Sequence, residues 1–178
     1  MKKIYLTAFL LLSIQTLLAC SCSFFWPDAA IIKNLSANSD LVVVGHPIKN
    51  IDDHYVSSNP KYMGTMILFK VDSIIKGKLM SDTIFINQET MGNCSLFFTS
   101  NEKYVIFGQQ IKSYKKAEND SHAASSGYSN KTLTFRDQNN LLPFFKDLTK
   151  KYYTITTNQC ISFTSRDSFI SEYFNLTK

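Results

Sequence analysis

Asp40-Leu41-Val42-Val43-Val44-Gly45 is predicted to enter a buried β-strand, because its β-branched run suits the interior of a sheet. Further strands are expected at 62–76, 82–87, 103–111, 132–135 and 153–157. No long helix alternates regularly with these strands, which argues against parallel βαβ units. We therefore predict a mainly β domain built on an antiparallel barrel of five or six strands.

Short helices are expected at both ends of this domain. At 27–38 Asp28 favours the positive N-terminal end of a helix, and at 166–176 apolar residues recur at helical spacing. A third helix is expected at 140–152. The tract 112–131 is polar and poor in large apolar side chains, so it is predicted to be a loop insertion.

Residues 1–19 have the features of an export signal. Two lysines precede an apolar core from Leu6 to Leu12, and the leader ends at Leu17-Leu18-Ala19. The apolar run is shorter than the roughly 20 residues that a spanning helix needs. We expect a single domain at 20–178 that is exported, whether secreted, periplasmic or held at the cell envelope.

Charge and motif content exclude several classes of function. The leader holds two lysines and no acidic residue, so its removal lowers the formal charge from +5 to +3. The remaining lysines are spread along the sequence, so no nucleic-acid partner is expected. His46, His54 and His122 share no short metal-ligand spacing, so we expect no metal site and no cofactor of the protein's own. No hydrolase, phosphate-loop or zinc-protease motif is present, so the chain is not expected to be an enzyme.

The chain contains four cysteines, Cys20, Cys22, Cys94 and Cys160, and the first of them can carry either a disulfide or a lipid. In an exported protein two disulfides are the default. A bond between Cys20 and Cys22 would close too tight a loop, which leaves two crosswise pairings. Leu-Leu-Ala-Cys also resembles the lipobox of bacterial lipoproteins. A lipid on Cys20 would exclude a disulfide there and leave one cysteine without a partner.

Several landmarks, in order along the chain, carry a resemblance to a known family. The mature chain would open on Cys20-Ser21-Cys22-Ser23, with a short helix before the strand. The later landmarks are Phe69-Lys70-Val71, Ile75-Lys76-Gly77, Gly92-Asn93-Cys94, Lys103-Tyr104-Val105-Ile106-Phe107-Gly108 and Thr156-Thr157-Asn158-Gln159-Cys160. Over about 20–175 this pattern resembles the tissue inhibitors of metalloproteinases (TIMPs) and the wider netrin-like domain family.

The resemblance implies a five-stranded barrel of the oligonucleotide/oligosaccharide-binding (OB) type with terminal helices. It also implies the disulfides Cys20–Cys94 and Cys22–Cys160, each of which closes a long loop and would contribute about 4 to 5 kcal/mol in the chain-entropy model. The chain departs from the animal inhibitors: it lacks their third disulfide and their cysteine-rich second domain, and the stretch 112–152 is expanded. These departures bear on the partner more than on the fold.

The resemblance further implies a protease-binding edge made of Cys20, Ser21, Cys22, Asn93, Cys94 and Ser95. The free amine and the backbone carbonyl of Cys20 would chelate the catalytic zinc of a metalloprotease. The amine must be unprotonated, and its usual pKa of about 7.7 to 8.0 permits this near neutral pH. Ser21 would point toward the protease's specificity pocket, and the loop 93–95 would flank it.

A lipid on Cys20 would abolish this chelate, because the amine is acylated when a lipoprotein matures. The alternative function is then a cell-envelope lipoprotein that binds other partners, has no inhibitory activity and touches the membrane only through its lipid. The state of Cys20 therefore decides between the two functions.

Overall fold

The computed structural model describes residues 27–51, 61–88, 90–91, 94–117, 127–137 and 139–176. The predictions made for the leader at 1–19, and for Cys20, Ser21, Cys22 and Asn93, concern residues outside these ranges. Among the described helices, none has the length and apolar character needed to cross a membrane.

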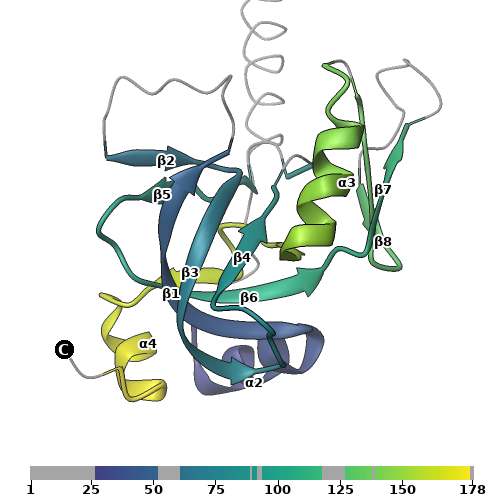
Figure 1. Cartoon of the computed structure of the whole chain (residues 1–178). Coiled ribbons are helices and arrows are strands. Elements are labelled where there is room, and N and C mark those ends of the chain that lie inside the picture. The colour runs from purple at the N-terminus through teal and green to yellow at the C-terminus, as the bar shows by residue number, and fades with distance from the viewer. Residues whose placement is uncertain are drawn as a thin grey trace, which may run out of the picture.

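Five strands form a closed barrel. In order round the ring these are β1 (Leu41–Asn50), β3 (Ile67–Lys76), β4 (Thr83–Ile86), β10 (Tyr153–Thr156) and β6 (Tyr104–Gln110). β1 pairs with β6 as well as with β3, which closes the ring. Figure 1 shows β1, β3 and β4 side by side. The prediction of a mainly β, OB-fold-like barrel with short helices is therefore confirmed.

One joint of the barrel differs from the antiparallel arrangement that we predicted. β10 runs parallel to β4, with Tyr153 opposite Ile84 and Ile155 opposite Ile86. The other four joints are antiparallel. The long segment between β6 and β10 causes this difference. It brings the chain back so that β10 lies between β4 and β6, antiparallel to β6 and parallel to β4.

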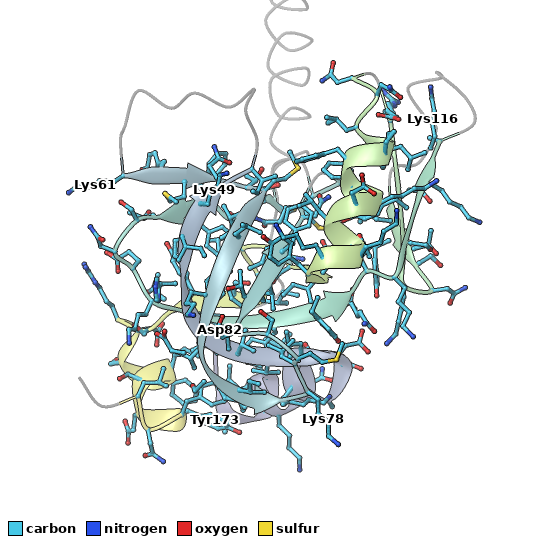
Figure 2. All side chains as sticks on the ribbon, in the orientation of Figure 1. Lys49, Lys61, Lys78, Asp82, Lys116 and Tyr173 are labelled. Atoms are coloured by element: carbon cyan, nitrogen blue, oxygen red, sulfur yellow. The ribbon has the colours of Figure 1, made fainter. Side chains whose placement is uncertain are left out.

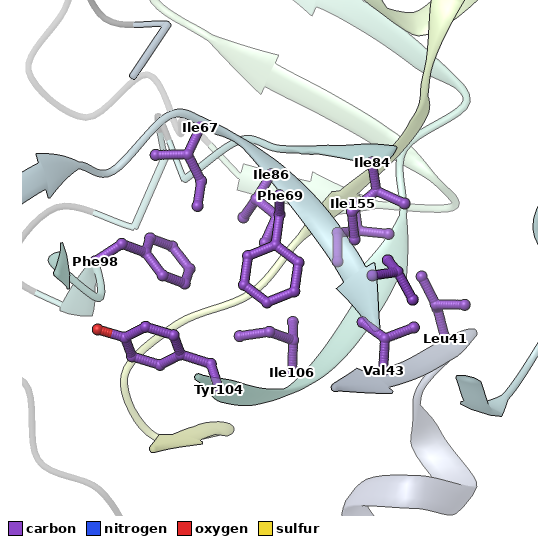
Figure 3. Close-up of a cluster of buried hydrophobic side chains, with 11 residues drawn as sticks. Leu41, Val43, Ile67, Phe69, Ile84, Ile86, Phe98, Tyr104, Ile106 and Ile155 are labelled. Carbon is purple, nitrogen blue, oxygen red and sulfur yellow. The ribbon is translucent and has the colours of Figure 1, made fainter. Parts of the chain in front are cut away.

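The interior of the barrel is filled by one apolar cluster, shown in Figure 3. Its buried members come from every strand of the ring and from Phe98: Leu41, Val43, Ile67, Phe69, Val71, Ile84, Ile86, Phe98, Tyr104, Ile106 and Ile155. The alternate residues Val42 and Val44 belong to a second cluster with Ile32 and Ile170 of the flanking helices. β1 is therefore covered on both faces, which explains its unbroken apolar run.

The two terminal helices are confirmed in slightly shorter form. α2 spans Ala29–Asn38 and α4 spans Ser168–Tyr173. Each is capped by an aspartate whose carboxylate accepts the N–H of a residue in the first turn: Asp28 caps α2 at 2.8 Å and Asp167 caps α4 at 3.1 Å. Both helices pack on the outside of the barrel against the second cluster.

The strand predicted at 62–76 is divided. β2 (Tyr62–Gly64) pairs with the short β5 (Phe98–Thr99), and β3 begins only at Ile67. Gly64 has a φ of +83°, a conformation that favours glycine and breaks the strand. β11 (Ser162–Thr164), which we did not predict, pairs with β6 beside the Cys160 loop.

The prediction of a loop insertion at 112–131 is wrong in part. This segment contains β7 (Ser113–Lys116) and β8 (Gly127–Ser129), which flank β9 (Thr132–Phe135) in a three-stranded sheet. α3 (Leu142–Lys151) packs on this sheet, since the ring of Tyr114 stacks on that of Phe145 at 5.2 Å. We call β7, β8, β9 and α3 the side layer, which Figure 1 shows beside the barrel.

The side layer has its own apolar core, which connects it to the barrel. Phe85, on the outer face of β4, lies 6.3 Å from the ring of Phe145 between centroids. Leu133 and Phe135 belong to the same buried cluster. Phe144, the neighbour of Phe145 in the helix, is 42% exposed. α3 is therefore anchored by Phe145 and leaves Phe144 at the surface.

Candidate functional site

The loops that carry Cys94 and Cys160 lie side by side. The backbone N–H of Gln159 donates a hydrogen bond of 2.9 Å to the carbonyl oxygen of Cys94. Cys94 follows β4 by a short connection, and Cys160 lies between β10 and β11. The structure thus brings together two of the predicted site residues that are 66 positions apart in sequence.

Neither of these two cysteines is a free thiol, since both are disulfide-bonded. The chain has four cysteines, so their bonds join them either to each other or to Cys20 and Cys22. The specific pairs Cys20–Cys94 and Cys22–Cys160 stay predictions. What the described residues establish is that the two downstream sulfurs are oxidised and come from adjacent loops.

A buried glutamine braces the Cys94 loop. Gln88 is 1% exposed, and its amide nitrogen donates to the carbonyl oxygens of Thr65 and Leu96 at 3.0 and 2.9 Å. Its amide oxygen accepts the N–H of Leu96 at 2.7 Å. The Gln88 side chain therefore links the loop after β4 to the turn before β3. The sequence analysis missed this residue, because a glutamine in a polar loop carries no distinguishing pattern.

Ser95 faces inward rather than toward solvent. Its side chain is 7% exposed, and its hydroxyl donates to the carbonyl oxygen of Gln88 at 3.4 Å. The next residue, Leu96, packs against the barrel interior. The predicted contact role of Ser95 would therefore have to use its backbone. Its side chain helps to fix the loop.

The Cys160 loop is braced by its own polar residues. The side-chain oxygen of Asn158 accepts the N–H of Cys160 at 2.9 Å, and its backbone carbonyl accepts the N–H of Ile161 at 3.2 Å. The buried hydroxyl of Thr157 donates to the carbonyl oxygen of Phe107 at 3.0 Å and lies 2.6 Å from that of Ser162. The Thr-Asn-Gln-Cys stretch is thus held against β6 at several points.

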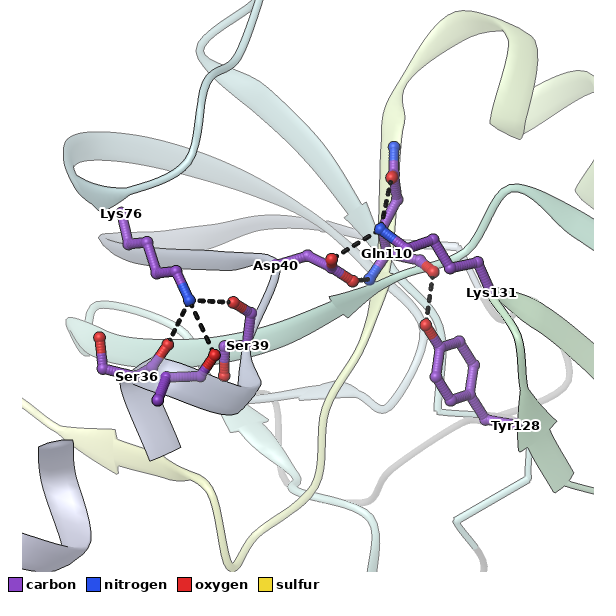
Figure 4. A network of polar contacts seen from close by, with 8 residues as sticks. Ser36, Ser39, Asp40, Lys76, Gln110, Tyr128 and Lys131 are labelled. Carbon is purple, nitrogen blue, oxygen red and sulfur yellow. Dashed lines mark hydrogen bonds and ion pairs between the residues drawn. The ribbon is translucent and has the colours of Figure 1, made fainter. Parts of the chain in front are cut away.

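Lys76 fixes the C-terminal end of α2, the helix that follows the cysteine pair in sequence. Its ammonium group donates to the carbonyl oxygens of Ser36, Ala37 and Ser39 at 2.5, 3.0 and 2.7 Å, as Figure 4 shows in part. A cation is favourable at a helix C-terminus, where carbonyl groups lack partners within the helix. Gly77 follows with a φ of +97°. The Lys-Gly landmark therefore has a structural role in holding α2 to β3.

Asp40 joins the barrel to the side layer in the same region (Figure 4). Its carboxylate pairs with the ammonium of Lys131 at 2.6 Å and accepts the N–H of Gln110 at 2.9 Å. The hydroxyl of Tyr128 donates to the carbonyl oxygen of Gln110 at 2.7 Å. Burial alone would raise the pKa of Asp40, but the hydrogen bonds and charge of its partners, Lys131 above all, lower it below the usual value.

A groove of about 1080 Å³ lies between α4 and the outer surface of the barrel. Asp72 in this groove pairs with Lys103 at 3.1 Å, and its other oxygen lies 3.3 Å from Nδ1 of His46. Among the described residues, no three His, Cys, Asp or Glu side chains gather as metal ligands. His54 and His122 lie outside those residues.

Comparison with known proteins did not identify a relative of this chain. No family model, no curated protein and no solved structure matches the chain. Function must therefore be argued from the residues and their geometry alone.

Proposed function

We propose that the mature chain is an exported, TIMP-like inhibitor of zinc metalloproteases that acts through the free amine and the carbonyl of Cys20. The observation that carries this proposal is the adjacency of two disulfide-bonded cysteines, Cys94 and Cys160, in loops joined by a hydrogen bond. The OB-like barrel and the landmarks around Lys76 support the same family.

The adjacency fits what a Cys-x-Cys segment requires. In an extended chain, residues two apart project from the same side and lie about 6.6 Å from each other. A disulfide in turn needs Cα atoms within about 4.4 to 6.8 Å. Cys20 and Cys22 can therefore both be bound only if their partners are close neighbours, as Cys94 and Cys160 are.

Rigid loops also suit an inhibitor of this kind. The Gln88 amide braces the Cys94 loop, and Asn158 braces the Cys160 loop. A terminus tied to both loops would lose little conformational entropy on entering a protease cleft. The zinc belongs to the protease, so the inhibitor supplies only two ligand atoms and their fixed position. On this proposal the chain is neither an enzyme nor the holder of a metal.

The chelate gives the proposal a sharp test. The mature protein is compared with a variant that carries one extra alanine before Cys20, in inhibition assays against a panel of zinc metalloproteases. We expect inhibition by the mature form and a loss of at least about a hundredfold on extension, because the α-amino group is displaced from the cysteine. Equal thermal unfolding of the two forms is the control for folding. Inhibition that survives the extension would contradict the proposal.

The inhibitor and the lipoprotein alternative can be distinguished by intact-mass measurement and peptide mapping of the protein exported by its native host. A free Cys20 in disulfide linkage agrees with the inhibitor. A Cys20 with lipid on its sulfur and an acyl group on its amine would leave Cys94 and Cys160 to pair with each other and would leave Cys22 as one free thiol. Thiol titration of the denatured, unreduced protein counts that group directly, and a positive result would replace inhibition by an envelope-anchored binding role.

A further inference from the structure

The side layer concentrates positive charge that the sequence spreads out. Residues 112–151 contain eight basic and four acidic side chains, a net charge of +4, whereas the whole chain carries +5 and two of its lysines lie in the leader. The rest of residues 20–178 therefore carries a net charge of −1. Folding places most of this basic segment in one sheet and one helix beside the barrel (Figure 1).

Two of the described ion pairs involve the side layer, Lys131 with Asp40 and Lys150 with Asp147, and they leave most of its basic side chains without an acidic partner among the described residues. On the barrel Asp82 pairs with Lys70, Asp72 pairs with Lys103 and Glu102 pairs with Arg166. In the side layer several exposed lysines form no ion pair with a described residue: Lys112, Lys115, Lys116, Lys146 and Lys151. This part of the surface therefore keeps an uncompensated positive charge.

Two of these lysines lie on β7 and α3, the elements that pack together in the side layer. Lys116 is two residues from Tyr114 on β7, so it projects toward α3 as Tyr114 does. Lys151 is exposed on α3, whereas Lys146, two residues from Phe144, projects from the opposite flank of the helix. Lys151 is seven residues from Phe144, nearly two full turns, so the two project from the same side of the helix. We call Lys116, Lys151 and Phe144 the basic face.

The aromatic ring distinguishes between classes of anionic partner. Phe144 is 42% exposed on the same side of α3 as Lys151, although Phe145 next to it is fully buried. An exposed apolar ring on the side of a lysine gains free energy where it can enter the boundary between lipid headgroups and acyl chains. A soluble polyanion would use only the lysines. We propose that the basic face binds the surface of membranes that contain anionic phospholipids.

The first experiment measures binding of the mature protein to vesicles by flotation. Vesicles of phosphatidylcholine alone are compared with vesicles that also contain phosphatidylglycerol. We expect binding to the anionic vesicles that weakens as salt rises from about 0.1 M to about 1 M, because the Debye length falls from about 10 Å to about 3 Å. A lipid on Cys20 would act equally on both vesicle types, so the difference between them reports the basic face.

Matched lysine variants then locate the surface. Neutralising Lys116 and Lys151 to glutamine should weaken binding by about twenty-five-fold, since each lysine near an anionic surface contributes a factor of about five. The control changes Lys49 and Lys78, two exposed lysines outside the side layer, to glutamine, which alters the net charge equally. Figure 2 shows Lys116 far from Lys49 and Lys78. An equal loss in both double variants would overturn the proposal.

The variant Phe144→Ser separates a membrane from a soluble polyanion. We expect its binding to anionic vesicles to fall by about threefold to tenfold, while its binding to dextran sulfate is unchanged. Thermal unfolding checks that the variant is folded. Unchanged vesicle binding would instead assign the face to a soluble polyanion. Absence of any preference for anionic vesicles would overturn the proposal outright. Neither result depends on protease inhibition.

Discussion

The side-chain oxygen of Gln88 accepts the N–H of Leu96 at 2.7 Å, while the amide nitrogen of the same side chain donates to the carbonyl oxygen of Leu96. One buried amide thus satisfies both backbone groups of a residue two positions beyond Cys94. A third bond, to Thr65, ties the pair to the start of β3. The position of the Cys94 loop depends on this side chain more than on regular secondary structure.

Replacing Gln88 by methionine keeps the volume but removes all three hydrogen bonds. Backbone groups of Leu96 and Thr65 would be left buried without partners, so we expect unfolding free energy to fall by about 2 to 4 kcal/mol. Urea unfolding of the disulfide-intact protein measures it. The control is Gln159→Met, because that side chain is exposed in the neighbouring loop. A similar loss at both positions would show that the Gln88 amide does not brace the loop.

Gly45 allows β1 and β3 to approach each other. A Cβ atom there would lie 2.0 Å from the carbonyl oxygen of Lys70 and 2.6 Å from the ring of Phe69. Because a backbone carbonyl cannot move aside without disturbing the barrel, Gly45→Ala should destabilise the protein by about 3 kcal/mol. At Gly127 a Cβ atom meets nothing within 4 Å, so Gly127→Ala is the control. Thermal unfolding compares the two variants. A melting temperature of Gly45→Ala equal to that of the wild type would contradict the predicted loss of stability.

The barrel could be predicted from sequence because its strands carry strong local signals. The β-branched run at 41–45 and the apolar run at 104–107 are buried whichever neighbours they have. The parallel joint between β4 and β10 could not be predicted, since it depends on the path of the chain between 111 and 152. Strand order is a property of the whole chain rather than of any one strand.

The side layer and the candidate site show a second limit. β7 and β8 were hidden because each presents one apolar side chain, Tyr114 or Tyr128, among polar residues. The importance of Gln88 was equally hidden, since its role arises from burial, which no local pattern reports. The cysteines could be predicted as site residues because their number and context carry chemical meaning without the fold.

Lys76 should stabilise the protein through the end of α2. Lys76→Met removes a cation from three carbonyl oxygens at a helix C-terminus, and we expect a loss of about 1 to 2 kcal/mol. Lys78→Met is the control, because Lys78 is exposed two residues further on. Chemical unfolding at low and at high salt distinguishes them. If the two variants had the same free energy of unfolding, the contact between Lys76 and α2 would not contribute to stability.

Asp40 should make stability depend on acid pH. Its folded-state pKa lies below the usual 3.8, so the charged carboxylate stabilises the fold above that value, and this contribution is lost as pH falls through the folded pKa. We expect Asp40→Asn to cost about 1 to 2 kcal/mol at neutral pH, because it weakens the contacts with Lys131 and Gln110.

That difference from the wild type should shrink as the pH is lowered below 3.8, where Asp40 itself becomes protonated. Urea unfolding of both proteins across this range measures it. Asp147→Asn is the matched control, since Asp147 forms an exposed ion pair with Lys150 on α3 and should change stability little at any pH. A pH-independent difference for Asp40→Asn would mean that the charge of Asp40 does not hold the side layer to the barrel.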